Sequence, residues 1–344
     1  MIMEVVNINM RVQEINKVIK RYYPPLGKVK VIRKFKGGFI NDVYLLEEVN
    51  GEKLVFKIRK GEKYSDLKRN SLLLSYLDQA GIPVTPLILT KDKMPCVMLN
   101  NNNSCEVYKY IDGKSMNSTK ISLHRIRDAA NLFSKLDRKL EDAGKIFSTF
   151  PTGKILTTKE LLKELYHYKN MLKGSRSRKK MRLYSFACKT IETLEKNLYK
   201  FDFHNLPYQI THGNLSDNNI IVDKDGRIQC IIDWDNIRKR PRIHSIVQQA
   251  LTVSGGYNTK TFISRFVQYL SIYSCHNPIF KEEIISILDF LTYRSLNRIW
   301  IFQHYIDFGQ EKSLKAISKL TTAERWLRNN HDLLDKKLKR LPFR

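Results

Sequence analysis

The stretch of the chain that decides the fold is ITHGNLSDNNIIVDKDGRIQCIIDWDNIRKRP, residues 210–241. Its pattern predicts a strand, a polar loop, a second strand, a tight turn, a third strand and a further loop. The first loop carries Asn214 and ends at Asn219, and Asp233 follows the third strand. Asn219 and Asp233 are therefore expected at the ends of adjacent strands of one hairpin. Amide and carboxylate oxygens so arranged suit Mg²⁺ bound together with nucleotide phosphates.

The composition is that of a soluble globular protein. The 344 residues suffice for one large or two ordinary domains, with 42% hydrophobic and 28% charged residues. The amino-terminal residues MIMEVVNINMRVQEINK lack the pattern of a secretory signal, and no apolar run is long enough to span a membrane. The five cysteines have no paired spacing. We therefore expect reduced thiols and a cytoplasmic location.

The formal net charge of +27 has two interpretations. Such a field favours anionic partners, including nucleotides, phosphorylated small molecules and acidic proteins. The chain is also rich in Lys, Asn and Ile, so many lysines are explained as simple surface coating. The densest basic run, SRSRKK at 175–180, indicates a solvated connection between two helices first and a binding patch second. No nucleic-acid-binding motif accompanies the charge, which argues against nucleic acid as a partner.

The amino-terminal third predicts a small antiparallel sheet. Alternating apolar residues over 28–58 form three strands, with glycines 37 and 38 at the first turn and Asn50-Gly51 at the second. A helical pattern follows at 65–81 and stops at Gly81. Two further strands are expected before Asp112-Gly113, on either side of a polar LNNNNS tip.

The rest of the chain is mostly helical in its periodicity. LHRIRDAANLFSKLDRKLEDAG is amphipathic, a helical pair flanks the basic run, and helices return from 243 to 340. The expected architecture is α+β: a domain of residues 1–112, with a β-sheet and one helix, and a helical domain of residues 113–344 that carries the 210–241 hairpin.

A second group of residues also points to phosphate binding. Glycines at a strand turn let backbone N–H groups approach phosphate oxygens, so Gly37 and Gly38 are candidates. Lys57, on the strand Val-Phe-Lys-Ile, can reach the same phosphates as a point charge. Each feature alone is weak, because most glycine pairs are plain turns and most strand lysines face solvent. The order of the parts along the chain matches the protein-kinase template and strengthens both.

The hairpin resembles the aminoglycoside phosphotransferase and choline kinase family, which includes homoserine-kinase-like and spore-coat kinase-like proteins. The family signature is roughly His-Gly-Asp-x-x-x-x-Asn followed by Ile-Asp-Trp-Glu/Asp. GGFINDVYLL, LVFKI, QAGIPVTP and VYKYIDG extend the resemblance over most of the chain. The resemblance implies a two-lobed protein-kinase-like fold, with ATP or GTP bound by Lys57 and by the 106–111 strand, including Lys109. It implies that Asn219 and Asp233 hold Mg²⁺.

The sequence departs from the family where the chemistry is decided. Asn214 stands in the place of the catalytic aspartate, which orients the acceptor hydroxyl and takes its proton; an amide can orient but is a poor base. His212 is the histidine that braces this loop in the family. Two further acids are absent: the partner of the lysine, expected near Asn70, and a loop-bracing aspartate, expected at His244-Ser245. Asp66 and Asp217 are the nearest acids that could substitute.

Two functions remain open at this point. One is a kinase that transfers phosphate to a small-molecule hydroxyl, slowed by Asn214. The other is a pseudokinase that binds nucleotide or a partner and acts as a scaffold or regulator. The basic helical part favours an anionic or neutral acceptor over a cationic antibiotic.

Overall fold

The computed structural model describes residues 12–35, 41–100, 103–118, 121–147, 149–197, 199–257 and 261–341. The chain forms two compact units. Unit 1 comprises the described residues up to Lys114 together with Ile221–Asp223 and Ile228–Ile232, and unit 2 comprises the remainder. The expected boundary after residue 112 stays a prediction. The division into units falls at Ser115, and two strands of the 210–241 hairpin are grouped with unit 1.

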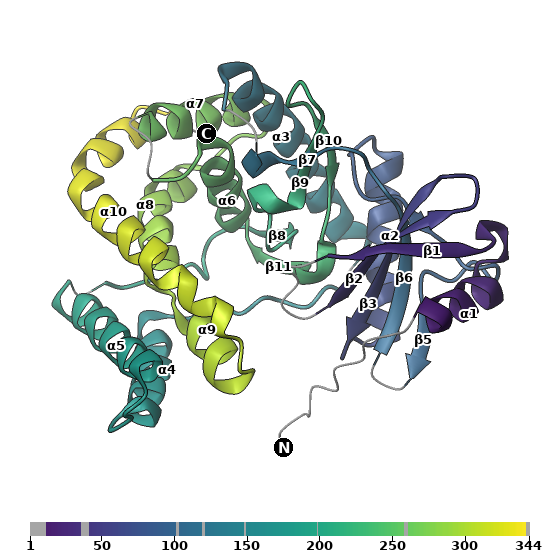
Figure 1. The fold of residues 1–344 in the computed structure, drawn as a ribbon. Coiled ribbons are helices and arrows are strands. Elements are labelled where there is room, and N and C mark those ends of the chain that lie inside the picture. The colour runs from purple at the N-terminus through teal and green to yellow at the C-terminus, as the bar shows by residue number, and fades with distance from the viewer. Residues whose placement is uncertain are drawn as a thin grey trace. The chain divides into compact units, whose positions relative to one another are not determined.

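Unit 1 is built on an antiparallel sheet (Figure 1). Its helices and strands are α1 (Val12–Tyr22), β1 (Val29–Lys34), β2 (Asp42–Glu48), β3 (Lys53–Lys60), α2 (Tyr64–Gln79), β4 (Leu87–Ile88), β5 (Val97–Asn100) and β6 (Asn103–Lys109), with a 3₁₀ turn at Pro24–Leu26. The strand order is β1-β2-β3-β6-β4, and β5 also pairs with β6. The predicted turn at Asn50-Gly51 is confirmed: Gly51 has φ +86°, and Asn50 Oδ1 accepts a hydrogen bond from the Glu52 N–H at 2.9 Å.

Helix α1 was not predicted from the sequence, and it covers one face of this sheet. Ile15 and Ile19, one turn apart, are fully buried in a core cluster with Phe56 and Val107 of the central strands. Side chains alternate between the two faces of a strand, so Lys57 points to the face opposite α1. The core therefore forms on one side of β3, and its polar residues gather on the other.

A three-stranded sheet, in the order β10-β9-β7, contains the predicted hairpin. Its strands are β7 (Lys114–Ser115), β9 (Ile220–Val222) and β10 (Ile228–Ile231). The strand β8 (Tyr208–Thr211) was also predicted, but its partner β11 (Arg238–Pro241) was not. The three strands expected within 210–241 are therefore confirmed, and the loop after them contains a fourth.

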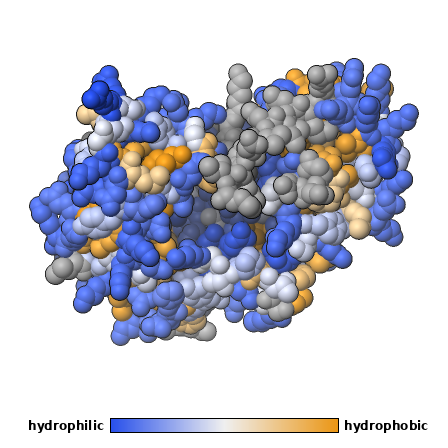
Figure 2. All heavy atoms as spheres, turned by 90° about the horizontal axis from the view of Figure 1, so that it is seen from below, coloured by the Kyte–Doolittle hydropathy of each residue, from blue (hydrophilic) through white to orange (hydrophobic). Residues whose placement is uncertain are grey.

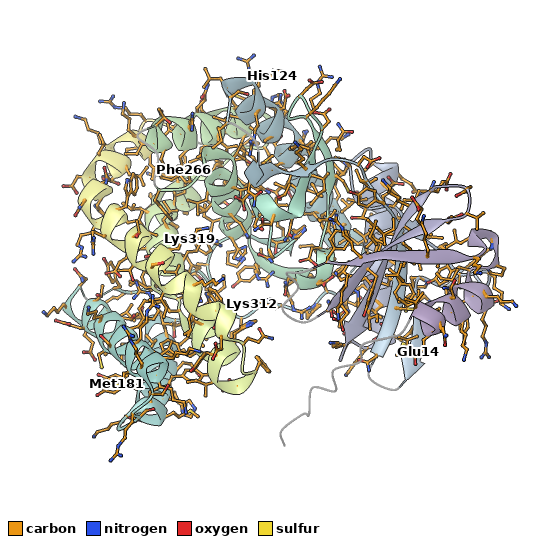
Figure 3. All side chains as sticks on the ribbon, viewed as in Figure 1. Glu14, His124, Met181, Phe266, Lys312 and Lys319 are labelled. Atoms are coloured by element: carbon orange, nitrogen blue, oxygen red, sulfur yellow. The ribbon has the colours of Figure 1, made fainter. Side chains whose placement is uncertain are left out.

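Unit 2 is mostly helical. Its helices are α3 (Leu123–Ile146), α4 (Thr158–Leu172), α5 (Arg178–Lys196), α6 (Arg242–Ser254), α7 (Phe262–His276), α8 (Lys281–Leu296), α9 (Ile299–Phe302) and α10 (Ala316–Leu338). Short turns of 3₁₀ or π helix lie at Met116–Ser118, Asp217–Asn219, Trp234–Asn236, Gln303–Asp307 and Glu311–Lys315. Phe266 of α7 is fully buried among these helices, whereas Met181 of α5 and Lys319 of α10 point outward (Figure 3).

On the face that is seen from below, hydrophilic residues predominate among the described residues and apolar ones form separate patches (Figure 2). No helix within the described residues combines the length and the apolar character that a membrane crossing needs. All five cysteines are free thiols.

Candidate active site

The loop between β8 and β9 is shaped by one glycine. Gly213 has φ +80°, and a Cβ placed on it would lie 2.2 Å from the Asn236 carbonyl oxygen and 2.3 Å from Arg240 Nη1. Any other residue would clash there and strain the backbone. The His-Gly-Asn sequence thus lets the chain turn tightly against the loop that follows β10.

Three side chains hold the backbone of this loop by its carbonyl oxygens. Asn219 Nδ2 donates to the Asn214 oxygen at 2.8 Å, and Thr252 Oγ1 of α6 donates to the Leu215 oxygen at 3.0 Å. Ser115 Oγ donates to the Asp217 oxygen at 2.8 Å. The loop therefore has a fixed backbone, set by residues from β7 and α6 as well as by its own asparagine.

His212 and Asn214 lie together in this loop, as predicted. His212 is 1% exposed, its ring lies 4.5 Å from the Trp234 ring, and its Nδ1 accepts the Asn214 N–H at 3.3 Å. Histidine therefore braces the loop, and a direct chemical role for it stays a prediction. The Asn214 side chain is exposed and makes no hydrogen bond to any described residue.

Asn219 and Asp233 lie at the same end of the β9–β10 hairpin, because one precedes β9 and the other follows β10. The bond from Asn219 Nδ2 to the loop fixes the amide so that Oδ1 is its remaining acceptor. Asp233 adopts a left-handed backbone with φ +66° and ψ +55°, which costs about 1–3 kcal/mol for a residue with a side chain. Such strain is typical of functional positions.

These two residues fit a magnesium ion shared with phosphate oxygens, since Mg²⁺ takes one or two protein oxygens and completes its octahedron with phosphate and water. Within the described ranges, no three His, Cys, Asp or Glu side chains cluster to form an all-protein metal site. Asp217, the acid that might have replaced a base at Asn214, is electrostatically coupled to the buried Arg125 of α3. Its carboxylate therefore has a partner within unit 2.

Lys57 is buried in β3 with 8% of its surface exposed, and it faces Glu106 across the β3–β6 pair. Glu106 itself accepts hydrogen bonds from Arg59 Nε at 2.5 Å and from the Tyr108 hydroxyl at 2.7 Å. Lys57 thus lies beside a buried ion pair that the sequence analysis missed. A charged residue inside an otherwise apolar strand was the only available signal.

The other predicted nucleotide contacts have different outcomes. Lys109 is exposed at the end of β6, and its backbone N–H already donates to the Pro86 oxygen at 3.0 Å. Contact between Lys109 and a nucleotide stays a prediction. It would involve the carbonyl oxygen or the side chain of Lys109, because the N–H is already bonded. Gly37 and Gly38 lie outside the described residues.

Residues 31–251, well over half of the chain, match a phosphotransferase enzyme family. The chain belongs to this family. No curated protein matches the sequence. The phosphotransferase resemblance seen in the hairpin is thereby confirmed, and the membership supports the predicted kinase activity.

Solved structures of similar fold agree with this membership. A spectinomycin phosphotransferase in complex with ADP and spectinomycin is 14% identical, with a TM-score of 0.69 over 93% of this chain and 99% of that one. A microcompartment-associated aminopropanol kinase is 12% identical, with a TM-score of 0.64 over 95% and 100%. An amicoumacin kinase with AMP-PNP, Ca²⁺ and Ami is 16% identical, with a TM-score of 0.59 over 86% and 89%. The predicted α+β, protein-kinase-like fold is confirmed.

One position where an acid was expected holds a serine that is bonded to a carboxylate of another helix. Ser245 occupies the position where a loop-bracing aspartate was expected, and its Oγ donates to Asp137 Oδ1 of α3 at 3.0 Å. Gln249 Nε2 and the Tyr273 hydroxyl donate to Asp137 Oδ2 at 3.0 and 2.9 Å. Burial raises the pKa of Asp137 to about 6, although these hydrogen bonds oppose the rise. A carboxylate of α3 is therefore bonded to the position of Ser245, and it joins α3 to α6 and α7.

The acid expected on α2 has no such replacement there. Asn70 is buried, and its Oδ1 has no hydrogen-bond partner. Asp66, the alternative considered, pairs with Arg69 of the same helix at 2.8 Å. The carboxylate that pairs in strand register with Lys57 is instead that of Glu106 on the neighbouring strand β6.

Proposed function

We propose that this phosphotransferase moves the γ-phosphoryl group of ATP, or of GTP, to a hydroxyl group of a small molecule. The bond from the acceptor oxygen to the γ-phosphorus forms as the bond from that phosphorus to the β–γ bridging oxygen breaks, and the nucleoside diphosphate leaves. Family membership supports the reaction class. The free thiols are consistent with a cytoplasmic location, which we propose on that basis.

The observation that carries the proposal is the pair Asn219 and Asp233. One side chain is held by a hydrogen bond that leaves its oxygen as an acceptor, and the other occupies a strained backbone at the same end of the hairpin. We propose that they hold Mg²⁺, which would offset the charge of the phosphate oxygens. Lys57 would contribute a point charge to nucleotide phosphates, as a lysine does in the kinase template.

Asn214 would orient the acceptor hydroxyl through its side-chain oxygen, and the hydroxyl proton would pass to water. Phosphoryl transfer depends mainly on positioning and charge neutralisation, so the lack of a base slows the reaction without abolishing it. A general base contributes typically about 10²–10⁴-fold. We therefore propose a working but slow enzyme.

Asn214 also favours the alternative, a pseudokinase that binds nucleotide, or an acidic protein partner, without turnover. The two functions differ in one measurable respect. The enzyme and a nucleotide-binding pseudokinase both predict that a nucleotide with Mg²⁺ raises the melting temperature, because the nucleotide binds only the folded state. A pseudokinase that binds only a protein partner predicts no such rise. Only the enzyme converts ATP to ADP in step with a phosphorylated product.

The first experiment combines thermal melting with a phosphate-transfer screen of small hydroxyl compounds. We expect millimolar ATP with Mg²⁺ to raise the melting temperature, and Asp233→Ala to abolish that rise and lower transfer about 1000-fold or more, since metal charge stabilisation is worth several kcal/mol. A wild-type protein that does not respond to either nucleotide would refute nucleotide binding. Intact transfer by Asp233→Ala would refute the metal site.

The second experiment restores the acid. Asn214→Asp should accelerate transfer by up to about 10²–10⁴-fold at pH 7. Asn218→Asp is the matched control: it adds the same charge to the same loop, and an aspartate keeps the acceptor that Asn218 offers to Asn117 at 2.5 Å. Equal rates in the wild type and Asn214→Asp would show that Asn214 does not occupy the position of a base.

A further inference from the structure

Two arginines of unit 2 have lost most of their contact with water and are neutralised by carboxylates. Arg242, at the start of α6, pairs with Glu283 through Nε at 2.9 Å and through Nη2, and its Nη1 donates to Asn277 Oδ1 at 3.0 Å. Arg298, just after α8, pairs with Glu324 at 2.5 Å. These arginines are 4% and 1% exposed. Each of these two buried guanidinium groups is therefore paired with a carboxylate.

Three other arginines of unit 2 lack that compensation. Arg238 and Arg240 of β11 and Arg294 of α8 are half-buried, and none is paired with a carboxylate among the described residues. Arg240 Nη1 donates only to neutral oxygens, those of Thr211 at 3.2 Å and Asn236 at 3.0 Å. Arg238 Nη1 donates to the Ile237 oxygen at 3.1 Å. Arg294 makes no hydrogen bond within this part of the chain.

The unpaired arginines gather around His244. This residue lies in the first turn of α6, directly after β11, and its ring is 5.6 Å from that of Phe290, which precedes Arg294 by one turn of α8. Burial lowers the pKa of His244 most, and the charges of Arg294 and Arg240 lower it further. His244 Nδ1 is buried and has no hydrogen-bond partner among the described residues. Burial and the charge of Arg238 lower the pKa of Arg240 to about 10.

This cluster borders the loop that carries Asn214. Arg240 is bonded to Thr211, the last residue before His212, and its Nη1 lies against the backbone of Gly213. Like charges held close together in a partly dry site repel one another and destabilise the fold. Unpaired arginines beside the loop of Asn214, in a unit that pairs Arg242 and Arg298 with carboxylates, are suited to an anionic ligand.

We propose that Arg240, Arg294 and Arg238, with His244, bind a carboxylate or phosphate group carried by the acceptor. Guanidinium groups suit both anions because their planar N–H donors match two oxygens at once. The inference rests on the proposed kinase function and narrows its substrate to hydroxyl compounds that bear a negative charge, such as hydroxy acids and sugar phosphates. A cationic aminoglycoside would be repelled.

The binding arm of the test needs no nucleotide. Inorganic phosphate and citrate are titrated into the wild type, Arg294→Met, Arg240→Met and Arg182→Met, with melting temperature as the readout at constant ionic strength. Arg182 is an exposed arginine of α5 and controls for net charge. We expect both anions to stabilise the wild type and Arg182→Met, and binding to weaken about 10- to 100-fold in the two cluster variants, since a hydrogen bond to a charged group is worth that much. Equal shifts in all four proteins would overturn the proposal.

The second arm separates the acceptor from the nucleotide. A transfer screen compares hydroxy acids and sugar phosphates with neutral sugars and aminoglycosides. We expect product from anionic compounds, a KM for them about 10- to 100-fold higher in Arg294→Met, and an unchanged response to ATP with Mg²⁺. Preference for neutral or cationic acceptors, or loss of ATP binding in Arg294→Met, would overturn it. No transfer and no ATP response in the wild type would instead refute the kinase function.

Discussion

The two sides of helix α6 differ in how their polar residues are paired. Arg242, Ser245 and Gln249 recur at helical spacing on one side, and every one of them is bonded to a carboxylate, that of Glu283 or of Asp137. His244 lies on another side, where the charges of Arg240 and Arg294 act on it and no carboxylate of the described residues pairs with these arginines. The first side stabilises the fold. The second maintains a positive potential next to the loop of Asn214, as binding an anion requires.

The largest expected effect comes from two arginines one helical turn apart. Arg298→Met removes a cation from a buried pair and leaves Glu324 with only the exposed Arg328, at 3.9 Å, as a cationic partner among the described residues, so the free energy of unfolding should fall by about 3–5 kcal/mol. Arg294→Met removes an unpaired cation and should leave stability within about 1 kcal/mol of the wild type. Denaturant unfolding of both variants measures the difference. A similar loss in the two would mean that Arg294, like Arg298, is a structural arginine and not a binding residue.

A smaller effect should appear in the pH dependence of stability. The folded state raises the pKa of Asp137 from its ordinary 3.8 to about 6, so it binds the proton more tightly than the unfolded chain does. The wild type should therefore lose about 3 kcal/mol of stability as the pH rises from about 4 to about 6, and no more above that range.

The variant Asp137→Asn isolates this effect, because its amide does not titrate. Unfolding free energies of the two proteins are compared between pH 4 and pH 7. The wild type should decline relative to the variant as the pH rises. A stability difference that stays constant with pH, or one that changes in the opposite direction, would contradict a raised pKa of Asp137.

The smallest effect tests the connection from α6 to the loop. Thr252→Val keeps the shape of the side chain and removes the hydrogen bond to the Leu215 oxygen, which should cost about 0.5–1.5 kcal/mol of stability. The rate of transfer should fall more than nucleotide binding, because the loop that carries Asn214 loses one of its three anchors. Ser264→Ala, on the exposed surface of α7, is the control. Equal behaviour of the two variants would show that the loop is positioned without Thr252.

Much of the fold could be predicted from local pattern. The Asn50-Gly51 hairpin, the helix over 65–81, the amphipathic helices and the three strands within 210–241 follow from turn residues and hydrophobic period, which act over a few neighbours. Helix α1 was missed because its short apolar stripe is explained only by the sheet against which Ile15 and Ile19 pack. The strand β11 was missed because its basic sequence forms a strand only beside β8.

The candidate site was predictable in its motif and not in its surroundings. His212, Asn214, Asn219 and Asp233 were placed in one loop and hairpin by spacing alone. The position of Glu106 beside Lys57 was not anticipated, because cross-strand pairing brings together residues that are distant in sequence. Arg59 and its partner Glu106 are 47 positions apart.

The sequence by itself determined the fold class and the family, since both reside in short motifs and their order, and it is the basis for the proposed replacement of an aspartate by Asn214. Only the tertiary structure decided where the charges are balanced. Ser245 is bonded to Asp137 across 108 positions and Arg242 to Glu283 across 41, while Arg240 and Arg294 are paired with no acid among the residues that the structure describes. The net charge of +27 counts these arginines alike. Burial and contact between distant residues separate the cations that support the fold from those that remain to bind an anion.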